Sequence, residues 1–196
     1  MKIVSTEIKI ELLDFKELVV GEQMLISRAC KVRLNAQAPY SHYWVGCSVM
    51  TPEAKFFDGC NVERVSLTQT THAEQNALDS MIAALGPHRI AEIAVVGAPE
   101  GQEIPWPLPL NDLKNLPSNL SPSDFCPSCG HCLQNIAENC FDKNGQFDPT
   151  IKLLGYNENQ NIIYRTTIGD AYPMPFLPQH LGINYTNDHR FKEKSQ

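Results

Sequence analysis

The spacing of hydrophobic positions predicts three helices. Apolar residues recur about once per helical turn over residues 16–37 and again over residues 72–86, which is the pattern of an amphipathic helix. A third helix is expected over residues 129–140, opening at a pair of cysteines. The Ala38–Pro39 step ends the first helix because a proline moves the preceding residue out of the helical conformation.

Five strands are predicted from the remaining apolar segments. Residues 43–51 and 55–62 form a hairpin across a Pro-Glu turn, and residues 151–157 and 161–167 form another. Residues 90–98 are a continuous apolar run suited to a buried central strand. This order of elements predicts an α/β fold, a three-layer α/β/α sandwich with a mixed five-stranded sheet and helices on both faces.

A proline-rich segment interrupts this pattern at about residues 99–125. Seven of the fourteen prolines lie between Pro99 and Pro127, and no periodic core pattern accompanies them. We therefore expect a single domain over residues 1–196, with an insertion at this point and a short C-terminal tail. Trp106, Leu108 and Leu110 within the insertion could form a lid over a pocket or a patch in a subunit contact.

Composition narrows the class of partner. The net charge is −6, and no basic stripe of the kind that binds nucleic acid polymers is present. No apolar run reaches the length of a membrane span or of a signal peptide, so we expect no membrane association. Seven cysteines, an odd number, do not form an evident disulfide framework. These features favour a cytoplasmic protein with a small-molecule partner.

The segment CPSCGHC, residues 126–132, carries the clearest chemical signal. A Cys-x-x-Cys at a helix start places two thiolates one turn apart, and His72 begins another helix. If both helices begin at the same edge of the sheet, His72 meets Cys129 and Cys132, which leaves a fourth zinc position for water, as in catalytic sites. A closed structural zinc site, with Cys126 as the fourth ligand, is the alternative.

Glu74 follows His72 by two residues and could accept a proton from the water molecule at that fourth position. Such a pairing suits hydrolytic attack on a carbon that bears a nitrogen leaving group. The alternative is an ordinary exposed carboxylate in the first turn of a helix, stabilised there by the helix dipole.

Five blocks in order resemble the cytidine deaminases, whose zinc signature is H-x-E followed by P-C-x-x-C. They are APYSHYWVGCSVMT, GCNVE, THAEQNAL, CGHCLQ and FLPQHLG. The Cys-Gly-x-Cys-x-Gln part of the family's pattern fits residues 129–134 and not the frame that begins at Cys126, and the proline that the family has directly before the first cysteine lies one position earlier here, at Pro127. The resemblance therefore implies one Zn²⁺ per subunit on His72, Cys129 and Cys132, Glu74 as the catalytic residue, Cys126 as a spare thiol and His131 facing away from the metal.

The resemblance also implies a substrate and its contacts. The reaction would be hydrolytic deamination of cytidine or deoxycytidine to uridine or deoxyuridine, with release of ammonia, by a homodimer or homotetramer. The residues implied to bind the free pyrimidine nucleoside are Asn61 and Glu63 at the sugar 3′-hydroxyl, Tyr43 on the base, and the backbone of Ala73 and of Pro127 or Ser128.

Besides the shifted proline, three positions depart from the family pattern: Arg64 replaces an asparagine, Leu133 an arginine and Leu181 an aromatic residue. Together with the insertion, they keep other interpretations open. These are deamination of another small aminated heterocycle or modified nucleoside, editing of a polynucleotide, which the acidic charge disfavours, and a zinc-stabilised binding module without turnover.

Overall fold

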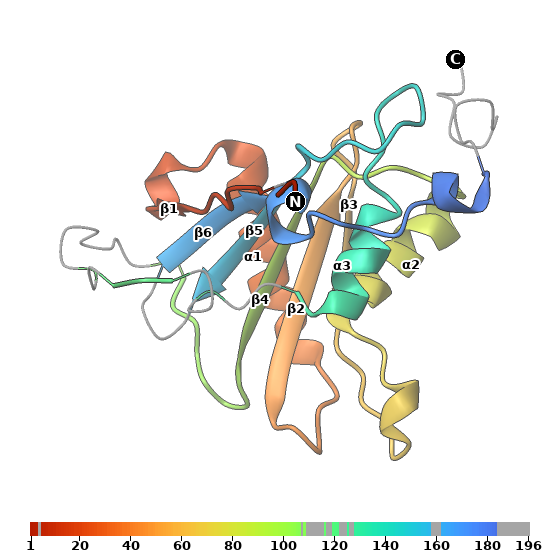
Figure 1. The fold of residues 1–196 in the computed structure, drawn as a ribbon. Helices are drawn as coiled ribbons and strands as arrows, with labels where there is room; N and C mark the ends of the chain where they lie inside the picture. The colour runs from red at the N-terminus through yellow and green to blue at the C-terminus, as the bar shows by residue number, and fades with distance from the viewer. Residues whose placement is uncertain are drawn as a thin grey trace.

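The fold is a three-layer α/β/α sandwich built on a mixed six-stranded sheet (Figure 1). The computed structural model describes residues 1–3, 5–106, 108, 116, 119–121, 125, 128–157 and 162–183. Across the sheet the strands run in the order β1-β6-β5-β4-β2-β3. Their bounds are β1 Glu11–Leu13, β2 Tyr43–Met50, β3 Phe56–Cys60, β4 Glu92–Pro99, β5 Lys152–Asn157 and β6 Ile162–Thr167.

Helices cover both faces of the sheet. Helix α1 (Val20–Val32) packs on one face, and α2 (Ala73–Leu85) and α3 (Gly130–Ala137) pack on the other. A short helix, α4, spans Ile168–Ala171, and single 3₁₀ turns lie at Phe15–Glu17, Arg33–Asn35, Leu67–Gln69 and Pro178–Leu181. The predicted fold class is confirmed.

Within the described residues, the predicted number of strands is corrected from five to six. The additional strand, β1, pairs antiparallel with β6 at the edge of the sheet. It has three residues, too few for an alternating pattern to be recognised. The predicted first helix is also shorter than expected, because Leu18 and Val19 have extended backbone conformations.

The side chains of each strand divide between two hydrophobic clusters. Odd-numbered residues of β2 and β4, such as Cys47, Val49 and Ile93, pack beneath α2 and α3. Even-numbered residues of β4, such as Ala94 and Val96, pack beneath α1. A Cβ at Gly59 would lie 2.6 Å from the Ala73 carbonyl oxygen, so this glycine allows the first turn of α2 to rest directly on β3.

The described part of the insertion lies mainly on the α1 face. Arg33 donates from Nη2 to the Gln102 carbonyl oxygen (2.7 Å), and Leu108 is buried in the cluster beneath α1. The Trp106 ring meets the Phe15 ring edge-on, with 5.0 Å between centroids. A lid formed by Trp106 and Leu108 over the α2 and α3 face is therefore wrong, and Leu110 lies outside the described residues.

None of the helices in these described ranges has both the length and the apolar content needed to cross a bilayer. The longest, α1 and α2, have 13 residues each.

Candidate metal centre

Two helix N-termini meet at one edge of the sheet and carry the predicted zinc donors. His72 is the N-cap residue of α2 and Cys129 is the N-cap residue of α3. Helix α2 precedes β4, α3 precedes β5, and these two strands are parallel. Both helices therefore begin at the same end of these parallel strands, which brings their first turns together as the sequence predicted.

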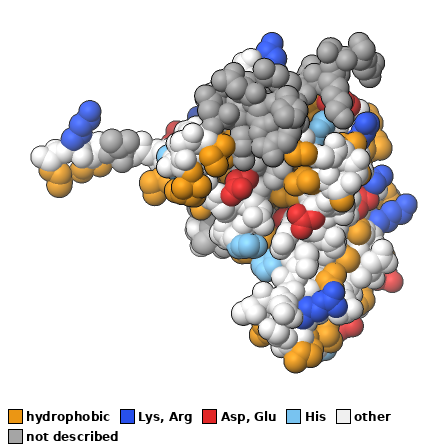
Figure 2. All heavy atoms as spheres, turned by 90° about the vertical axis from the view of Figure 1, so that its right-hand side faces the viewer, with side chains coloured by type: hydrophobic (Ala, Val, Ile, Leu, Met, Phe, Trp, Pro, Cys, Tyr) orange, Lys and Arg blue, Asp and Glu red, His pale blue; other side chains and the backbone are white. Residues whose placement is uncertain are grey.

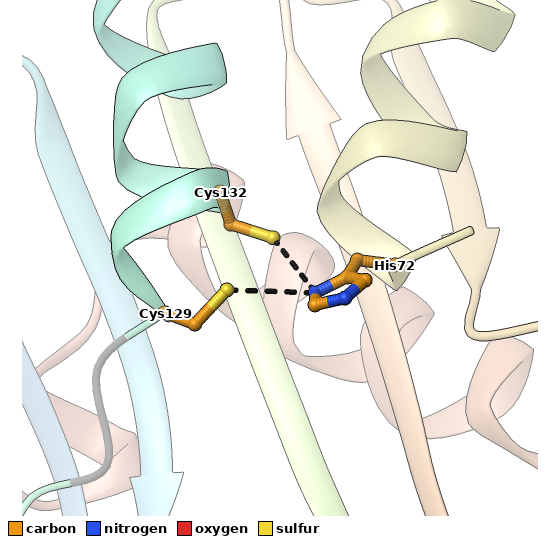
Figure 3. Close-up of side chains that lie close together, drawn as sticks. All are labelled: His72, Cys129 and Cys132. Atoms are coloured by element: carbon orange, nitrogen blue, oxygen red, sulfur yellow. Dashed lines mark hydrogen bonds between the residues drawn. The ribbon is translucent and has the colours of Figure 1, made fainter. Parts of the chain in front are cut away.

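Three donor atoms converge at this edge (Figure 3). His72 Nδ1 lies 3.5 Å from Cys129 Sγ and 3.3 Å from Cys132 Sγ, and all three donors lie within 4.8 Å of one another. Tetrahedral zinc with bonds of about 2.0 Å to nitrogen and 2.3 Å to sulfur separates such donors by about 3.5 Å. The donor set therefore fits zinc in both ligand type and spacing.

The donor sulfur of Cys132 lies in a buried surrounding beside an acidic side chain. Cys132 is fully buried, and burial raises the pKa of its thiol, as do the nearby negative charges of Glu74 and Cys129. Burial also raises the pKa of the Cys47 thiol beneath the site, and Glu74 and Cys132 raise it further. A divalent ion held by these donors would deprotonate the coordinating thiols outright.

Glu74 is buried, with 5% of its surface exposed. The alternative of an exposed carboxylate in a helical first turn is therefore wrong. Its charge acts on the thiols of both Cys132 and Cys47, so the carboxylate lies close to the donor set. It occupies the first turn of α2.

Asn61 and Glu63 lie beyond the end of β3, which stops at Cys60, rather than on a continuous strand. Asn61 donates from Nδ2 to the Tyr43 carbonyl oxygen and accepts from Val45 N–H through Oδ1, both at 2.9 Å. Both residues are buried, and Asn61 thereby fixes the start of β2.

The Glu63 carboxylate holds the loop before β2. Its Oε2 accepts from the backbone N–H groups of Tyr40 (2.9 Å) and Ser41 (3.1 Å). The Ser41 side chain and these backbone amides lower the pKa of Glu63, which keeps the carboxylate ionised. Both of the residues implied to bind the sugar therefore also organise residues 40–45.

The other predicted substrate residues flank the donors. Tyr43 is half-buried, and its ring lies against Gly97 of β4 on the sheet face that α2 and α3 cover. Ala73 is buried directly after His72, and Ser128 is half-buried directly before Cys129. Cys126 and Pro127 lie outside the described residues, so the prediction that Cys126 is a spare thiol stays a prediction.

Two residues beside the site were not among the predicted ligand or substrate residues. His131, expected to face away from the metal, places its ring 5.7 Å from the His72 ring at an interplanar angle of 62°. Gly97 contacts the Tyr43 ring. A glycine inside an otherwise apolar strand was the available signal for Gly97, because it marks a close approach of another group.

Comparison with known proteins gives consistent matches. The family model described as the cytidine and deoxycytidylate deaminase zinc-binding region matches residues 21–144, a span that contains all three donors. The cytidine deaminase of Halalkalibacterium halodurans is 30% identical over 162 residues, covering 83% of this chain and 98% of the relative. That of Sporosarcina psychrophila is 28% identical over 159 residues, covering 81% and 93%.

Solved structures resemble the fold as well. The crystal structure of cytidine deaminase from Burkholderia pseudomallei has a TM-score of 0.55 and 30% identity, covering 78% of this chain and 97% of that one. Cytidine deaminase from Mycobacterium tuberculosis gives a TM-score of 0.54 at 22% identity, covering 81% and 98%, which supports the fold alone.

Proposed function

Since this chain belongs to the cytidine and deoxycytidylate deaminase family, we propose that it hydrolyses cytidine or deoxycytidine to uridine or deoxyuridine and releases ammonia. The observation that carries the proposal is the convergence of one imidazole nitrogen and two thiol sulfurs at zinc spacing beside a buried carboxylate. Bound zinc would supply Lewis-acid activation of water at neutral pH.

We assign roles to the residues as follows. His72, Cys129 and Cys132 hold one zinc ion per subunit. Glu74 accepts a proton from the attacking water and delivers it to ring N3 of the pyrimidine. Glu74 then takes the proton of the new C4 hydroxyl group and passes it to the amino group as the C4–N bond breaks, so that ammonia leaves and the C4 carbonyl forms. The buried position of Glu74 keeps this proton from bulk solvent.

We further propose that the substrate lies against the residues that flank the donors. Tyr43 offers an aromatic face to the base. Asn61 and Glu63 meet the sugar 3′-hydroxyl, and the backbone of Ala73 and Ser128 meets the pyrimidine carbonyl and the amino group. Glu63 supports this role because an ionised carboxylate is a strong hydrogen-bond acceptor for a hydroxyl group.

The proposed partner is a free nucleoside rather than a polymer. Among the described residues, the surface that carries α2 shows histidine and acidic side chains near its centre, with no continuous basic stripe (Figure 2). Polynucleotide binding needs such a stripe to neutralise phosphates. We also propose a single-domain, cytoplasmic protein that assembles as a homodimer or homotetramer.

The test is ammonia release from a panel of cytidine, deoxycytidine, free aminated bases and single-stranded DNA, with Glu74→Gln as the matched variant. We expect turnover of the nucleosides, and a loss of about 10³-fold or more in Glu74→Gln with its zinc retained. Turnover of the bases alone would favour the heterocycle alternative, and turnover of DNA alone would favour polynucleotide editing. Zinc binding without any turnover would favour the binding module.

A further inference from the structure

We propose that Gly97 is a positioning residue of this site. The absence of a side chain at this point of β4 lets the Tyr43 ring lie against the sheet, and this sets the room that the pyrimidine base has above the ring. The inference rests on the proposed function in one respect, namely that Tyr43 packs on the base of the substrate.

The contact leaves no space for a methyl group. A Cβ built on Gly97 would lie 2.7 Å from Cε1 of Tyr43, 3.2 Å from its Oη and 3.3 Å from its Cζ. Carbon atoms in favourable contact are separated by about 3.5–4.0 Å. The φ angle of Gly97 is not positive, unlike those of Gly86 and Gly101, so its backbone conformation is open to any residue. The ring contact is therefore what the glycine accommodates.

The backbone of β2 cannot move away to relieve such a clash. The Tyr43 carbonyl oxygen and the Val45 N–H are both bonded to the Asn61 side chain at 2.9 Å. One residue further on, a Cβ at Gly46 would overlap the Ala29 carbonyl oxygen, which shows that α1 already presses on the opposite face of the strand.

The loop before Tyr43 is held as firmly. Glu63 accepts two backbone N–H groups of this loop, from Tyr40 and Ser41. His42, with a φ of 53°, has its Nδ1 2.7 Å from a Glu100 carboxylate oxygen, and its carbonyl oxygen accepts from Glu100 N–H at 2.8 Å. An added methyl group at position 97 must therefore displace the Tyr43 ring rather than the chain that carries it.

The direction of that displacement is toward the metal donors. Tyr43 and Gly97 are odd-numbered residues of β2 and β4, and odd-numbered residues of both strands face α2 and α3. His72, Cys129 and Cys132 lie in that helical layer, so a ring lifted from the sheet narrows the space between the ring and the donors.

The experiment is a double-mutant cycle of Gly97→Ala and Tyr43→Ala, measured as steady-state deamination of cytidine. We expect Gly97→Ala to raise KM about tenfold while kcat stays within about threefold of wild type, because the zinc donors and Glu74 are untouched. In the Tyr43→Ala background, the same glycine substitution should have no further effect on KM, because the ring is no longer there to displace. Zinc content should equal that of wild type in all four proteins.

Gly21→Ala is the matched control for the glycine substitution itself. Its new Cβ would make an ordinary contact, 3.5 Å from Met50 Sδ beneath α1, and KM should stay unchanged.

Two outcomes overturn this inference while the wild-type protein still turns over cytidine and the proposed function stands. One is an unchanged KM in Gly97→Ala. The other is a KM increase from Gly97→Ala that is equally large in the Tyr43→Ala background. A wild-type protein that turns over neither nucleoside overturns the proposed function and this inference with it. If Gly97→Ala does not fold, recovery of folding in the double variant supports the ring contact, and failure of both variants overturns it.

Discussion

Single residues of this site could be predicted where the chemistry fixes both residue type and spacing. The donors His72, Cys129 and Cys132 follow from ligand preference and from two helices that start at one sheet edge. The bonds of Asn61 to β2 could not be predicted, because they depend on the exact register in which Gly46 pairs with Cys60. That register is a property of the assembled sheet and leaves no pattern in the sequence.

The buried donor Cys132 should be needed for metal retention. We expect Cys132→Ser to lose most of its zinc, because a hydroxyl group replaces a thiolate among the three donors that the described residues bring together. Zinc per chain, measured by elemental analysis after gel filtration, tests this. Cys140→Ser is the matched control, since Cys140 is also fully buried but is not one of the donors. Equal zinc in both variants would contradict the assignment.

Asn61 should matter to stability as well as to substrate binding. Asn61→Ala leaves the Tyr43 carbonyl oxygen and the Val45 N–H without their side-chain partner, at a cost of about 1–3 kcal/mol in the free energy of unfolding. Urea unfolding measures this cost, and the KM for cytidine should rise in the same variant. An unchanged unfolding midpoint would show that the two backbone groups find other partners.

At the scale of elements, the sequence predicted α2, α3 and the strands beneath them well, because each of these elements is long enough to show its hydrophobic period. The predicted strand over residues 90–98 and the observed β4, Glu92–Pro99, nearly coincide. The predicted start of α1 was wrong because a hydrogen bond to the Glu22 carboxylate, rather than the spacing of apolar residues, determines where this helix begins. Glu22 accepts the Val19 N–H at 3.1 Å, and with it the helix begins at Val20.

Glu22 also joins separate elements through charge. Its fully buried carboxylate accepts from Lys152 Nζ of β5 at 3.1 Å and from Arg165 Nη1 of β6 at 2.8 Å. Burial alone would raise the pKa of Glu22, but the Val19 N–H and the two cations outweigh burial and hold the pKa below its ordinary value. A carboxyl group with a lowered pKa in the folded state contributes stability above its ordinary pKa and loses that contribution as the pH falls through the folded value.

Glu22→Gln should therefore reduce the free energy of unfolding by about 1–3 kcal/mol at pH 7, because it removes the buried charge partner of Lys152 and Arg165, which keep their pairs with Glu92 and Glu11. The difference from wild type should shrink as the pH is lowered from about 5, near the ordinary carboxyl value, toward 3. Urea unfolding at several pH values measures both effects. A difference that stays constant over this range would show that the carboxylate charge is not responsible.

At the scale of the whole molecule, the chain extends the sheet beyond the segment that matches the family model. Residues before position 21 lie outside that match, and they supply β1 at the edge beside β6. Arg165 bonds Glu11 at 2.6 Å, and the Thr166 hydroxyl donates to the Lys9 carbonyl oxygen at 2.8 Å. An exposed strand edge invites pairing with other chains, so β1 protects β6.

Deletion of residues 2–13 should consequently lower the melting temperature and increase self-association, while kcat/KM for cytidine stays within about threefold because the metal donors lie on other elements. Thermal unfolding and light scattering of the deleted and full chains test this. A large loss of activity without any change in stability would assign the N-terminal segment a direct role in the site.

The path of the insertion could not be predicted, because its proline-rich sequence has no hydrophobic period. This path determines which face of the sheet the insertion packs against. Its first part packs on the α1 face, where Trp106 meets Phe15, rather than over the donors on the α2 and α3 face. Trp106→Ala should lower the free energy of unfolding by about 1–2 kcal/mol, since it removes an edge-on aromatic pair and part of its buried area. The KM for cytidine should stay within about twofold, because nothing that touches the substrate has moved. A tenfold change in KM at full stability would instead place Trp106 at the pocket and restore the lid interpretation.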